Sequence, residues 1–533
     1  MVRCVAYRPG GIRRRVVSLS LLAAVSTVLV TGCGGSSSSS TARDLAYVPG
    51  QYLSFDTFQH RCEAPRIGSN PNTGEPYPDQ PGSTLAENHF LRAWMNDRYL
   101  FYNQIPDLNP NDHDSPTQYF MAMRPDFDEF YFHMPTAQWQ QQSQAGASVG
   151  YGIRWLIDFP QVFIAYVEPG SPGDIDRGWG RLQRGDEVLA INGVSLSGSV
   201  TSAQANMINR ALSGEANTAF DFNFATSAGG NQTVTLTAET VTSSPVLVDT
   251  VLDVGDVQVG YILFNSHIAP AEAALFNAIS DLQQAGVDEL VLDLRYNGGG
   301  SLAIASQLAY MIAGPDATNN RAFESLQFND KHTTINPFTD APNRPISFID
   351  ETLGLGAMSS GQSLPSLDLP RVFVLSGAST CSASESIINA LTGIDIDVLL
   401  FGAGTCGKPF GFYPTSNCGT TYFATHFRTV NDQGFGGYDD GFIPEDAHGI
   451  PGVPLPGCSA ADDLSRPLGN PAEGRLAVAL NYMQTDSCHD AQIDMLSHAE
   501  GVTGIGRMVQ SEDAFAPAPR WLQERILFPD ERL

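Results

Sequence analysis

The feature that most constrains the fold is an alternation of short apolar runs with helical stretches between residues 259 and 401. Pro270 begins a helical stretch that ends at Gly286, a second helix is expected over residues 301–313, and a third begins near Ser382. The apolar runs cover residues 259–264, 289–294, 371–375 and 398–401. Strands that alternate with helices predict a largely parallel sheet whose two faces are covered. In such sheets the functional loops gather at the carboxyl ends of the strands.

Residues 147–242 have a different pattern, in which short strand-like runs are separated by Gly, Pro and Asp turns. The segments 167–172 and 182–193, together with Gly150, Tyr151, Gly152 and Ile153 before them, resemble PDZ domains. The resemblance implies that residues 150–153 present backbone N–H groups to the terminal carboxylate of a peptide, which adds a strand to the sheet edge. A small β domain with a hairpin glycine pair is the alternative.

The residues before this segment are expected to form a linker and a helical region. Residues 61–82 are rich in Pro, Gly, Asn and Asp, which favours irregular structure. Thr84 and Glu87 have the spacing of a capping box, and apolar residues then recur at helical spacing. We therefore expect a small, mostly helical domain over residues 84–146, whose aromatic residues serve packing rather than ligand binding.

The N-terminus has the features of a targeting signal. Arginines precede an apolar run over residues 16–30, which is short for a membrane span but fits the core of a signal peptide. The run ends in Val30-Thr31-Gly32-Cys33, which resembles a bacterial lipobox, and residues 34–40 supply a flexible Gly/Ser tether. We expect Cys33 to be lipidated. An ordinary signal peptide with a chance cysteine is the alternative.

The patterns above predict a multidomain α/β protein. Its expected segments are a signal peptide (1–32), a lipidated cysteine with an irregular linker (33–83), a helical domain (84–146), a PDZ domain (147–242), a core (243–490) and a C-terminal extension without an interpretable motif (491–533). The formal net charge is −28, from 29 Lys and Arg against 57 Asp and Glu. Because this charge repels phosphate backbones and no basic stripe is present, nucleic acid is not an expected partner.

Six cysteines remain once Cys4 is assigned to the signal and Cys33 to lipid. An even number of cysteines in an exported protein predicts disulfides, whereas a metal site is not expected because no CxxC pair or histidine ladder is present. Cys406 and Cys418 bracket a short Gly/Pro-rich segment and are the first expected pair. Cys458 with Cys488 is the second, which leaves Cys62 with Cys381.

Three segments carry residues suited to catalysis. The first is residues 293–300, directly before a helix; the second is residues 379–385, also directly before a helix; the third is residues 404–411. Ser382 lies at a helix N-terminus, where free N–H groups favour a developing oxyanion. Lys408 lies among apolar residues, with no carboxylate within four positions, which suits the buried neutral amine that a lysine base must be. A surface lysine and a serine that merely caps a helix are the alternative for either residue alone.

Together the three segments resemble the carboxyl-terminal processing (tail-specific) proteases. Thr380-Cys381-Ser382-Ala383-Ser384-Glu385 aligns with the nucleophile element of that family, and Lys408 with its lysine. The resemblance implies a ClpP/crotonase-like core, Ser382 as nucleophile, Lys408 as general base, and the backbone N–H groups of Ala383 and Gly299 as oxyanion donors. Many members carry a glutamine four positions after the lysine, but this chain has Phe412 there. Asp293 is interpreted as a structural residue that caps backbone N–H groups.

These observations and the resemblance predict an envelope serine endopeptidase that cleaves protein or peptide substrates through an acyl-enzyme on Ser382. The resemblance adds cleavage near the C-termini of those substrates as one option. The expected location is the periplasmic face of the outer membrane, reached through the lipid anchor. No cofactor is expected, and the sequence predicts neither the substrate nor the oligomeric state. A catalytically inactive PDZ-containing receptor or scaffold is the main alternative. Acyl-CoA chemistry on a crotonase-like core is a weaker one, because CoA is a cytoplasmic cofactor.

Overall fold

The computed structural model describes residues 46–71, 74–198, 200–227, 229–488 and 525–526. The expected signal peptide, the lipidation residue Cys33 and nearly all of the C-terminal extension lie outside these residues. The chain divides at Ala46, and the unit that begins at Tyr47 contains every element named below. Within the described part of the chain, no helix has both the length and the apolar character needed to cross a membrane.

The N-terminal region is mostly helical, as predicted. Its helices are α2 (Thr84–Arg98), α3 (Pro116–Ala122) and α4 (Thr136–Ala145), with short strands β1 (Arg61–Cys62), β2 (Gln80–Pro81) and β3 (Phe132–Pro135) and 3-10 turns η1 (Phe55–Thr57), η2 (Tyr102–Gln104) and η3 (Pro110–Asp112). Ser83, rather than Thr84, caps α2, because its Oγ accepts a hydrogen bond of 3.2 Å from the Ala86 N–H. Phe90 and Trp94 are buried inside the region, so its aromatic residues serve packing.

A β domain follows. Its main sheet has the order β10-β9-β7-β6-β5, with β8 beside β7, and β4 pairs separately with β11. The elements are β4 (Ala147–Gly150), β5 (Ile153–Asp158), β6 (Gln161–Val167), η4 (Pro172–Asp174), β7 (Glu187–Ile191), β8 (Val194–Ser195), α5 (Ser202–Ser213), β9 (Ala219–Ala225), β10 (Asn231–Thr237) and β11 (Glu239–Thr242). A capping box between Thr201 and Gln204 begins α5. Buried and exposed residues alternate along β9 and β10, as expected for a sheet with one face on a core.

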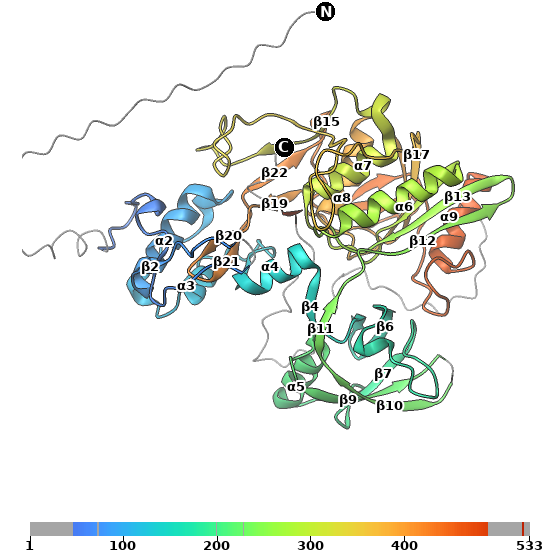
Figure 1. The fold of residues 1–533 in the computed structure, drawn as a ribbon, viewed down its shortest axis with the longest axis horizontal. Coiled ribbons are helices and arrows are strands. Elements are labelled where there is room, and N and C mark those ends of the chain that lie inside the picture. The colour runs from blue at the N-terminus through green and yellow to red at the C-terminus, as the bar shows by residue number, and fades with distance from the viewer. Residues whose placement is uncertain (1–45, 72–73, 199, 228, 489–524, 527–533) are drawn as a thin grey trace, which may run out of the picture. The chain divides into compact units, whose positions relative to one another are not determined.

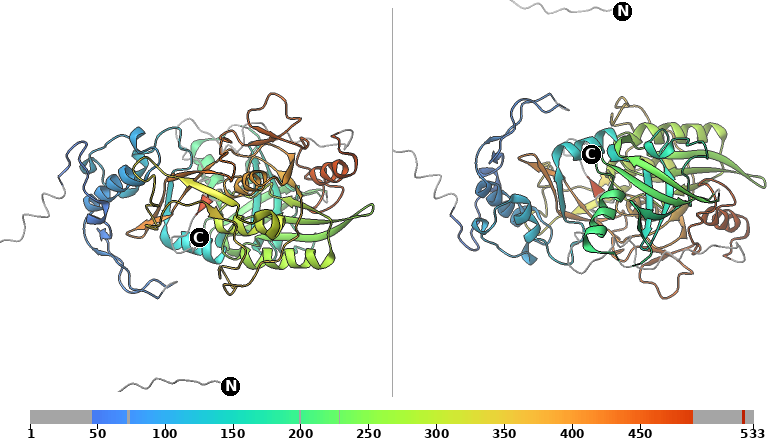
Figure 2. Two further views of the ribbon diagram at one scale, coloured as in Figure 1. Left: turned by 90° about the horizontal axis from the view of Figure 1, so that it is seen from above. Right: turned by 90° about the horizontal axis from the view of Figure 1, so that it is seen from below.

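The core contains the predicted parallel sheet, with strand order β12-β13-β14-β17-β18. Strands β13 (Val257–Phe264), β14 (Glu289–Asp293), β17 (Arg371–Ser376) and β18 (Asp397–Gly402) run parallel, and β12 (Val246–Val254) is antiparallel to β13. Apolar residues of α6 (Ala271–Ala285), α7 (Leu302–Thr318) and α8 (Ala383–Gly393) cover one face (Figure 1). Residues of α9 (Gly474–Thr485) pack on the other face, and Figure 2 shows the core from two further directions.

The remaining strands form smaller sheets beside the core. One has the order β16-β15-β22-β19-β25, another β20-β21-β3, and β23 pairs with β24. Their bounds are β15 (Ala322–Gln327), β16 (Ile346–Ser347), β19 (Phe410–Phe412), β20 (Thr415–Asn417), β21 (Thr420–Phe423), β22 (Phe427–Val430), β23 (Phe442–Pro444), β24 (Val453–Leu455) and β25 (Arg525–Ile526). Because β3 belongs to the N-terminal region, the second sheet joins that region to the segment after Lys408.

The structure contains three disulfides, Cys62–Cys418, Cys381–Cys406 and Cys458–Cys488. The prediction for Cys458 and Cys488 is confirmed, whereas the pairing of Cys406 with Cys418 is wrong, and so is the remaining pair. Cys418 lies in the turn between β20 and β21, a hairpin that pairs with the N-terminal region and therefore reaches Cys62. Cys406 lies instead beside the loop that contains Ser382.

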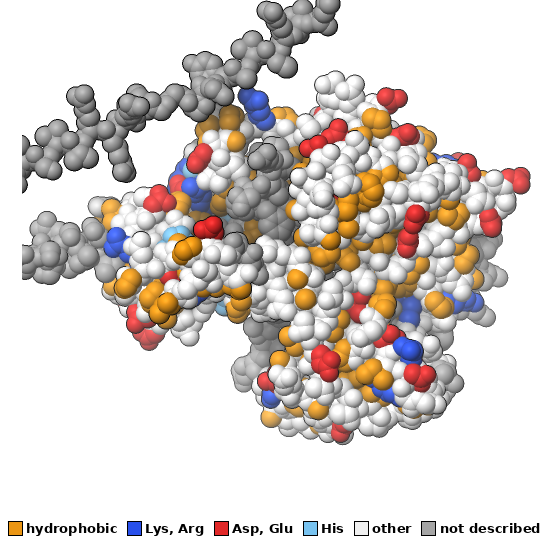
Figure 3. Space-filling model, in the orientation of Figure 1, with side chains coloured by type: hydrophobic (Ala, Val, Ile, Leu, Met, Phe, Trp, Pro, Cys, Tyr) orange, Lys and Arg blue, Asp and Glu red, His pale blue; other side chains and the backbone are white. Residues whose placement is uncertain are grey.

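Acidic side chains predominate on the surface, in keeping with the formal net charge of −28. Figure 3 shows them spread over the drawn face, with basic side chains in small separate groups.

Candidate active site

Ser382 occupies a sharp turn between strand β17 and helix α8. It is the N-cap residue of α8, and its backbone has φ 60° and ψ −116°, which is a costly conformation for a residue other than glycine. The side chain is fully buried, and its Oγ has no hydrogen-bond partner among the described residues. A strained turn that aims an unpaired hydroxyl from a helix N-terminus is the arrangement that a serine nucleophile needs.

Gly299 lies against this turn, as predicted. A Cβ at this position would lie 2.9 Å from both the Ser382 Cβ and the Ala383 N, and φ is 100°, so only glycine fits. The N–H of Ala383 donates no hydrogen bond within the described residues, which leaves it available to an oxyanion. The prediction for Gly299 as a second donor needs correction, because its N–H donates to Asn297 Oδ1 over 2.9 Å.

Lys408 is fully buried beneath aromatic rings. Its Nζ lies 4.3 Å from the centroid of the Phe130 ring and 4.9 Å from that of Phe412. Phe412, at the position of the glutamine found in many relatives, therefore contacts the amine but offers it no hydrogen bond. The sequence alone does not indicate Phe130, which is far from Lys408 along the chain. It lies two residues before β3, and β3 pairs with β21 of the segment that follows Lys408.

Asp128 is a second residue near Lys408 that sequence analysis missed. Its carboxylate is buried and accepts hydrogen bonds from the Tyr99 hydroxyl over 2.7 Å and from the Phe130 N–H over 3.0 Å. Burial raises the pKa of Asp128, while the bond from Tyr99 and the charge of Lys408 act in the opposite direction. The lysine thus has a carboxylate in its surroundings, although none is close to it in sequence.

Glu385, three residues after Ser382, joins the serine and lysine segments. Its Oε2 accepts the N–H of Ser382 and the N–H of Lys408, each over 2.9 Å. Its Oε1 accepts the Thr405 hydroxyl over 2.6 Å and the Gly407 N–H over 2.8 Å. Burial raises the pKa of Glu385 above the usual carboxyl range, and these hydrogen bonds act in the opposite direction. An acidic residue at the third position of a predicted helix was the available signal for this role.

The Cys381–Cys406 disulfide joins the same two segments, with Cα atoms 5.2 Å apart. The two sulfurs and the Glu385 carboxylate form a cluster that could hold a metal ion if the cysteines were thiols. Because both sulfurs are in the disulfide, neither is a thiolate ligand. The cluster therefore connects loops and is not a metal centre.

Asn297 and His267 support the glycine loop from the other side. Asn297 Nδ2 donates to the Phe264 carbonyl over 2.9 Å, and its Oδ1 lies 3.0 Å from His267 Nδ1. His267 is buried, and burial lowers its pKa to about 3, although the bond with Asn297 acts in the opposite direction. The histidine is therefore neutral at ordinary pH.

A buried ionic network anchors the start of this loop. The Arg295 guanidinium binds Asp293, Asp462 and Glu473 in the protein interior. Asp293 also accepts the Arg295 N–H over 3.2 Å, which is the structural role predicted for it. Arg184 of the β domain ion-pairs with Asp462 and donates to the Tyr296 hydroxyl over 2.6 Å. These contacts tie the β domain to the loop that contains Gly299.

The predicted peptide-binding residues Gly150, Tyr151, Gly152 and Ile153 connect β4 to β5. Within the described residues, the N–H groups of Tyr151 and Gly152 donate no hydrogen bond. The four residues line a cavity of about 770 Å³ that also touches Tyr296 of the core. Neither Ser382 nor Lys408 lines it, so the residues predicted to bind peptides and those predicted to act in catalysis do not share this cavity.

Ser382 and Lys408 are both inaccessible to solvent in this conformation. A peptide bond can therefore reach the Ser382 hydroxyl only after the surrounding side chains move. The Ser382 Oγ accepts no hydrogen bond from Lys408 in this conformation. The two segments are joined instead through Glu385, which accepts the backbone N–H groups of both residues.

Comparison with known proteins agrees with this geometry. Residues 258–416 match the model of peptidase family S41, and residues 86–131 match the S41 N-terminal domain. A carboxyl-terminal-processing protease of Picosynechococcus is 28% identical over 204 residues, which cover 38% of this chain and 47% of the relative, so the alignment spans about half of that protein. Disks large homolog 2 of Danio rerio is 23% identical over 129 residues, covering 22% of this chain and 14% of its own.

Among solved structures, a protein of Bacteroides fragilis described as an S41 protease has a TM-score of 0.55 and 22% identity, covering 75% of this chain and 97% of its own. At this identity the likeness concerns the fold. The matched residues 258–416 include Gly299, Ser382, Glu385 and Lys408. Two segments of the chain thus match domains of peptidase family S41, in agreement with the resemblance to the carboxyl-terminal processing proteases.

Proposed function

We propose that this chain is a serine endopeptidase with Ser382 as nucleophile and Lys408 as general base. The observation that carries the proposal is the attachment of both residues to one atom, since their N–H groups bind the same Glu385 oxygen at 2.9 Å. A disulfide between Cys381 and Cys406 restrains the same segments a second time. These two links limit how far the serine and lysine segments can move relative to each other, which favours general-base catalysis once the side chains meet.

The reaction has two halves. Neutral Lys408 accepts the Ser382 proton while Oγ attacks the carbonyl carbon of the substrate, and the developing oxyanion lies near the Ala383 N–H at the start of α8. Lysine then returns the proton to the leaving amine, which breaks the peptide bond and leaves an ester on Ser382. A water molecule, deprotonated by Lys408, hydrolyses that ester and restores the serine.

The β domain supplies peptide capture in this proposal. The unbonded N–H groups of Tyr151 and Gly152 would bind the terminal carboxylate of a peptide. Strand β5 is the last strand of its sheet, and its free edge would receive the peptide as an added strand. Both properties are those of PDZ-type capture, and both depend on backbone groups rather than on one side chain.

A serine-directed phosphonate separates this function from that of an inactive receptor. The reagent should add one phosphonyl group to the peptide that contains Ser382, as detected by mass spectrometry, and the Ser382→Ala variant should remain unlabelled. Ser384→Ala serves as the matched control, since this second serine of the same turn donates its hydroxyl to the Asn297 carbonyl. If the wild-type protein binds peptides but stays unlabelled, the receptor function is correct instead.

We further propose that Cys33 anchors the protein to the bacterial cell envelope, at the periplasmic face of the outer membrane. The lipobox-like sequence ending at Cys33 supports this location. Cys33→Ser should move the protein from the membrane fraction into a soluble envelope fraction, whereas unchanged partitioning would contradict lipid anchoring.

A further inference from the structure

We propose that Arg154 makes the capture site selective for peptides that carry a carboxylate at or near their C-terminus. The inference rests on the proposed capture of peptides by the β domain and adds the chemistry that the site selects. It concerns a residue outside the loop 150–153 and far from the catalytic dyad.

Arg154 is placed to contact the first residues of a bound chain. It follows Ile153 directly, as the second residue of β5, and lies opposite Tyr166 of β6. Within the described residues, β5 pairs only with β6, so its other edge is open to an added strand. Ile153 and Trp155, on either side of Arg154, pack against the domain core. Because side chains alternate along a strand, Arg154 is directed away from that core.

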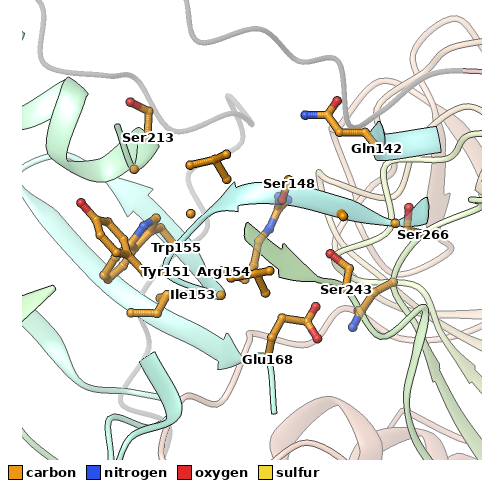
Figure 4. A pocket seen from close by; sticks show the side chains of 18 of the residues that line it. Gln142, Ser148, Tyr151, Ile153, Arg154, Trp155, Glu168, Ser213, Ser243 and Ser266 are labelled. Carbon is orange, nitrogen blue, oxygen red and sulfur yellow. The ribbon is translucent and has the colours of Figure 1, made fainter. Parts of the chain in front are cut away.

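The cavity beside β5 receives this guanidinium. Figure 4 shows Arg154, Tyr151, Trp155 and Ser213 around the cavity, and Arg154 is among the residues that line it. Helix α5 contributes Leu212 and Ser213 to the wall, opposite β5. An apolar wall with one cationic group fits a peptide end that has an apolar last residue and a carboxylate beside it.

Arg154 has no carboxylate partner of its own. Within the described residues it forms no ion pair, and its Nε is buried without a hydrogen-bond acceptor. Glu168 is the only other charged residue in the described lining, and its Oε2 accepts the Ser244 N–H over 3.0 Å. A buried N–H without an acceptor is unfavourable, so a ligand carboxylate would satisfy a group that the protein leaves unpaired.

Two further polar groups in the cavity point to a ligand. Tyr151 and Asn265 are 2% and 8% exposed, and neither the tyrosine hydroxyl nor the asparagine amide has a hydrogen-bond partner within the described residues. Both line the cavity. Native proteins rarely leave such groups unsatisfied, and the N–H and C=O groups of a peptide match both of them.

The test measures peptide binding to the full chain with Ser382→Ala, which prevents turnover. Fluorescein-labelled peptides with an apolar last residue would be compared in two matched pairs by fluorescence anisotropy. In the first pair, the residue before the last is Asp in one peptide and Asn in the other. In the second pair, the C-terminus is a free carboxylate in one peptide and an amide in the other. We expect the parent protein to prefer at least one carboxylate-bearing member by about tenfold.

Arg154→Gln should remove that preference, and Arg154→Glu should reverse it toward a Lys-bearing peptide. If Arg154→Gln loses the preference for the Asp peptide over the Asn peptide, Arg154 binds the side-chain carboxylate. If it loses the preference for the free acid over the amide, Arg154 binds the terminal carboxylate. Arg181→Gln is the matched control, because Arg181 belongs to the same domain, ion-pairs with Asp174 on its surface and does not line the cavity. It should leave both ratios unchanged.

Two results would overturn the inference, and they are distinguishable from each other. If Arg154→Gln binds every peptide as the parent does, Arg154 has no part in selection although capture stands. If the parent binds none of the peptides, the proposed capture function fails and the inference fails with it.

Discussion

Ser382 and Lys408 donate their backbone N–H groups to the same oxygen atom, Oε2 of Glu385, each over 2.9 Å. A buried carboxylate thus holds the turn of Ser382 and the segment of Lys408 together. If Ser382 and Lys408 act as the proposed dyad, we expect this carboxylate to position them, because Phe412 packs against the amine but offers it no hydrogen bond.

Removing either member of the dyad should cost the same activity. Ser382→Ala and Lys408→Ala should each reduce kcat/KM by at least about 10⁴-fold, and the double variant should be no worse, because members of one catalytic unit are not additive. Lys408→Arg should be equally inactive, since guanidinium stays protonated and cannot accept the serine proton. Steady-state proteolysis checks this, with Lys331→Ala as the control. Near wild-type activity in Lys408→Arg would transfer the role of base to a histidine such as His267.

Glu385→Gln should show whether Glu385 positions Ser382 and Lys408 without affecting substrate binding. Both carboxylate oxygens accept N–H groups, so the amide nitrogen would face an N–H donor in either orientation and the segments around it should shift. We expect kcat to fall by about 10²-fold while KM changes little, because substrate capture lies elsewhere. Thr405→Val removes the hydroxyl that donates to Oε1 and accepts the Phe442 N–H, but it leaves both bonds to Oε2 in place. It is the matched control and should have a smaller effect on kcat. Equal kcat for Glu385→Gln and the wild type would show that the carboxylate does not position the dyad.

The two core disulfides allow a controlled comparison, because they close loops of similar length, with sequence separations of 25 and 30. Chain entropy gives each a stabilisation of about 3 kcal/mol, so replacing either pair by serine should lower the unfolding free energy by a similar amount. Only the Cys381→Ser/Cys406→Ser variant should also lower kcat, since this disulfide joins the catalytic segments. Denaturant titration and kinetics check the two effects. A comparable loss of kcat in Cys458→Ser/Cys488→Ser would show that the Cys381–Cys406 disulfide has no specific effect on catalysis.

Acid should destabilise the protein partly through His267. Its pKa is about 3 in the folded state and about 6.5 in the unfolded state. Between these values the unfolded chain binds a proton that the folded chain excludes, so the unfolding free energy falls as the pH falls below about 6.5. The loss reaches roughly 3 kcal/mol by about pH 4. His267→Gln should show a shallower pH dependence in urea titrations than the wild type, and exposed His448→Gln should not.

The sequence by itself determined the local elements and the residues with motif-encoded roles. Strand and helix alternation predicted the parallel sheet, since apolar periodicity directly reflects which faces are buried. The same segments identified Ser382 and Lys408 as the dyad candidates and brought Gly299 beside the serine, because short elements with fixed spacing fold into similar turns. Cys458 and Cys488 were paired correctly from their position in the chain.

Only the tertiary structure decided which distant groups meet. Cys406 bonds to Cys381 rather than to nearby Cys418, and Phe130 reaches Lys408 from the N-terminal region. The Gly299 N–H is bonded to Asn297, and Arg154 Nε has no hydrogen-bond acceptor within the part of the chain that the structure describes. No local pattern indicates either outcome. These outcomes depend on how separate elements pack, and on which acceptors remain when buried polar groups are paired. Packing and pairing of this kind are properties of the whole fold and leave no periodic signal along the chain.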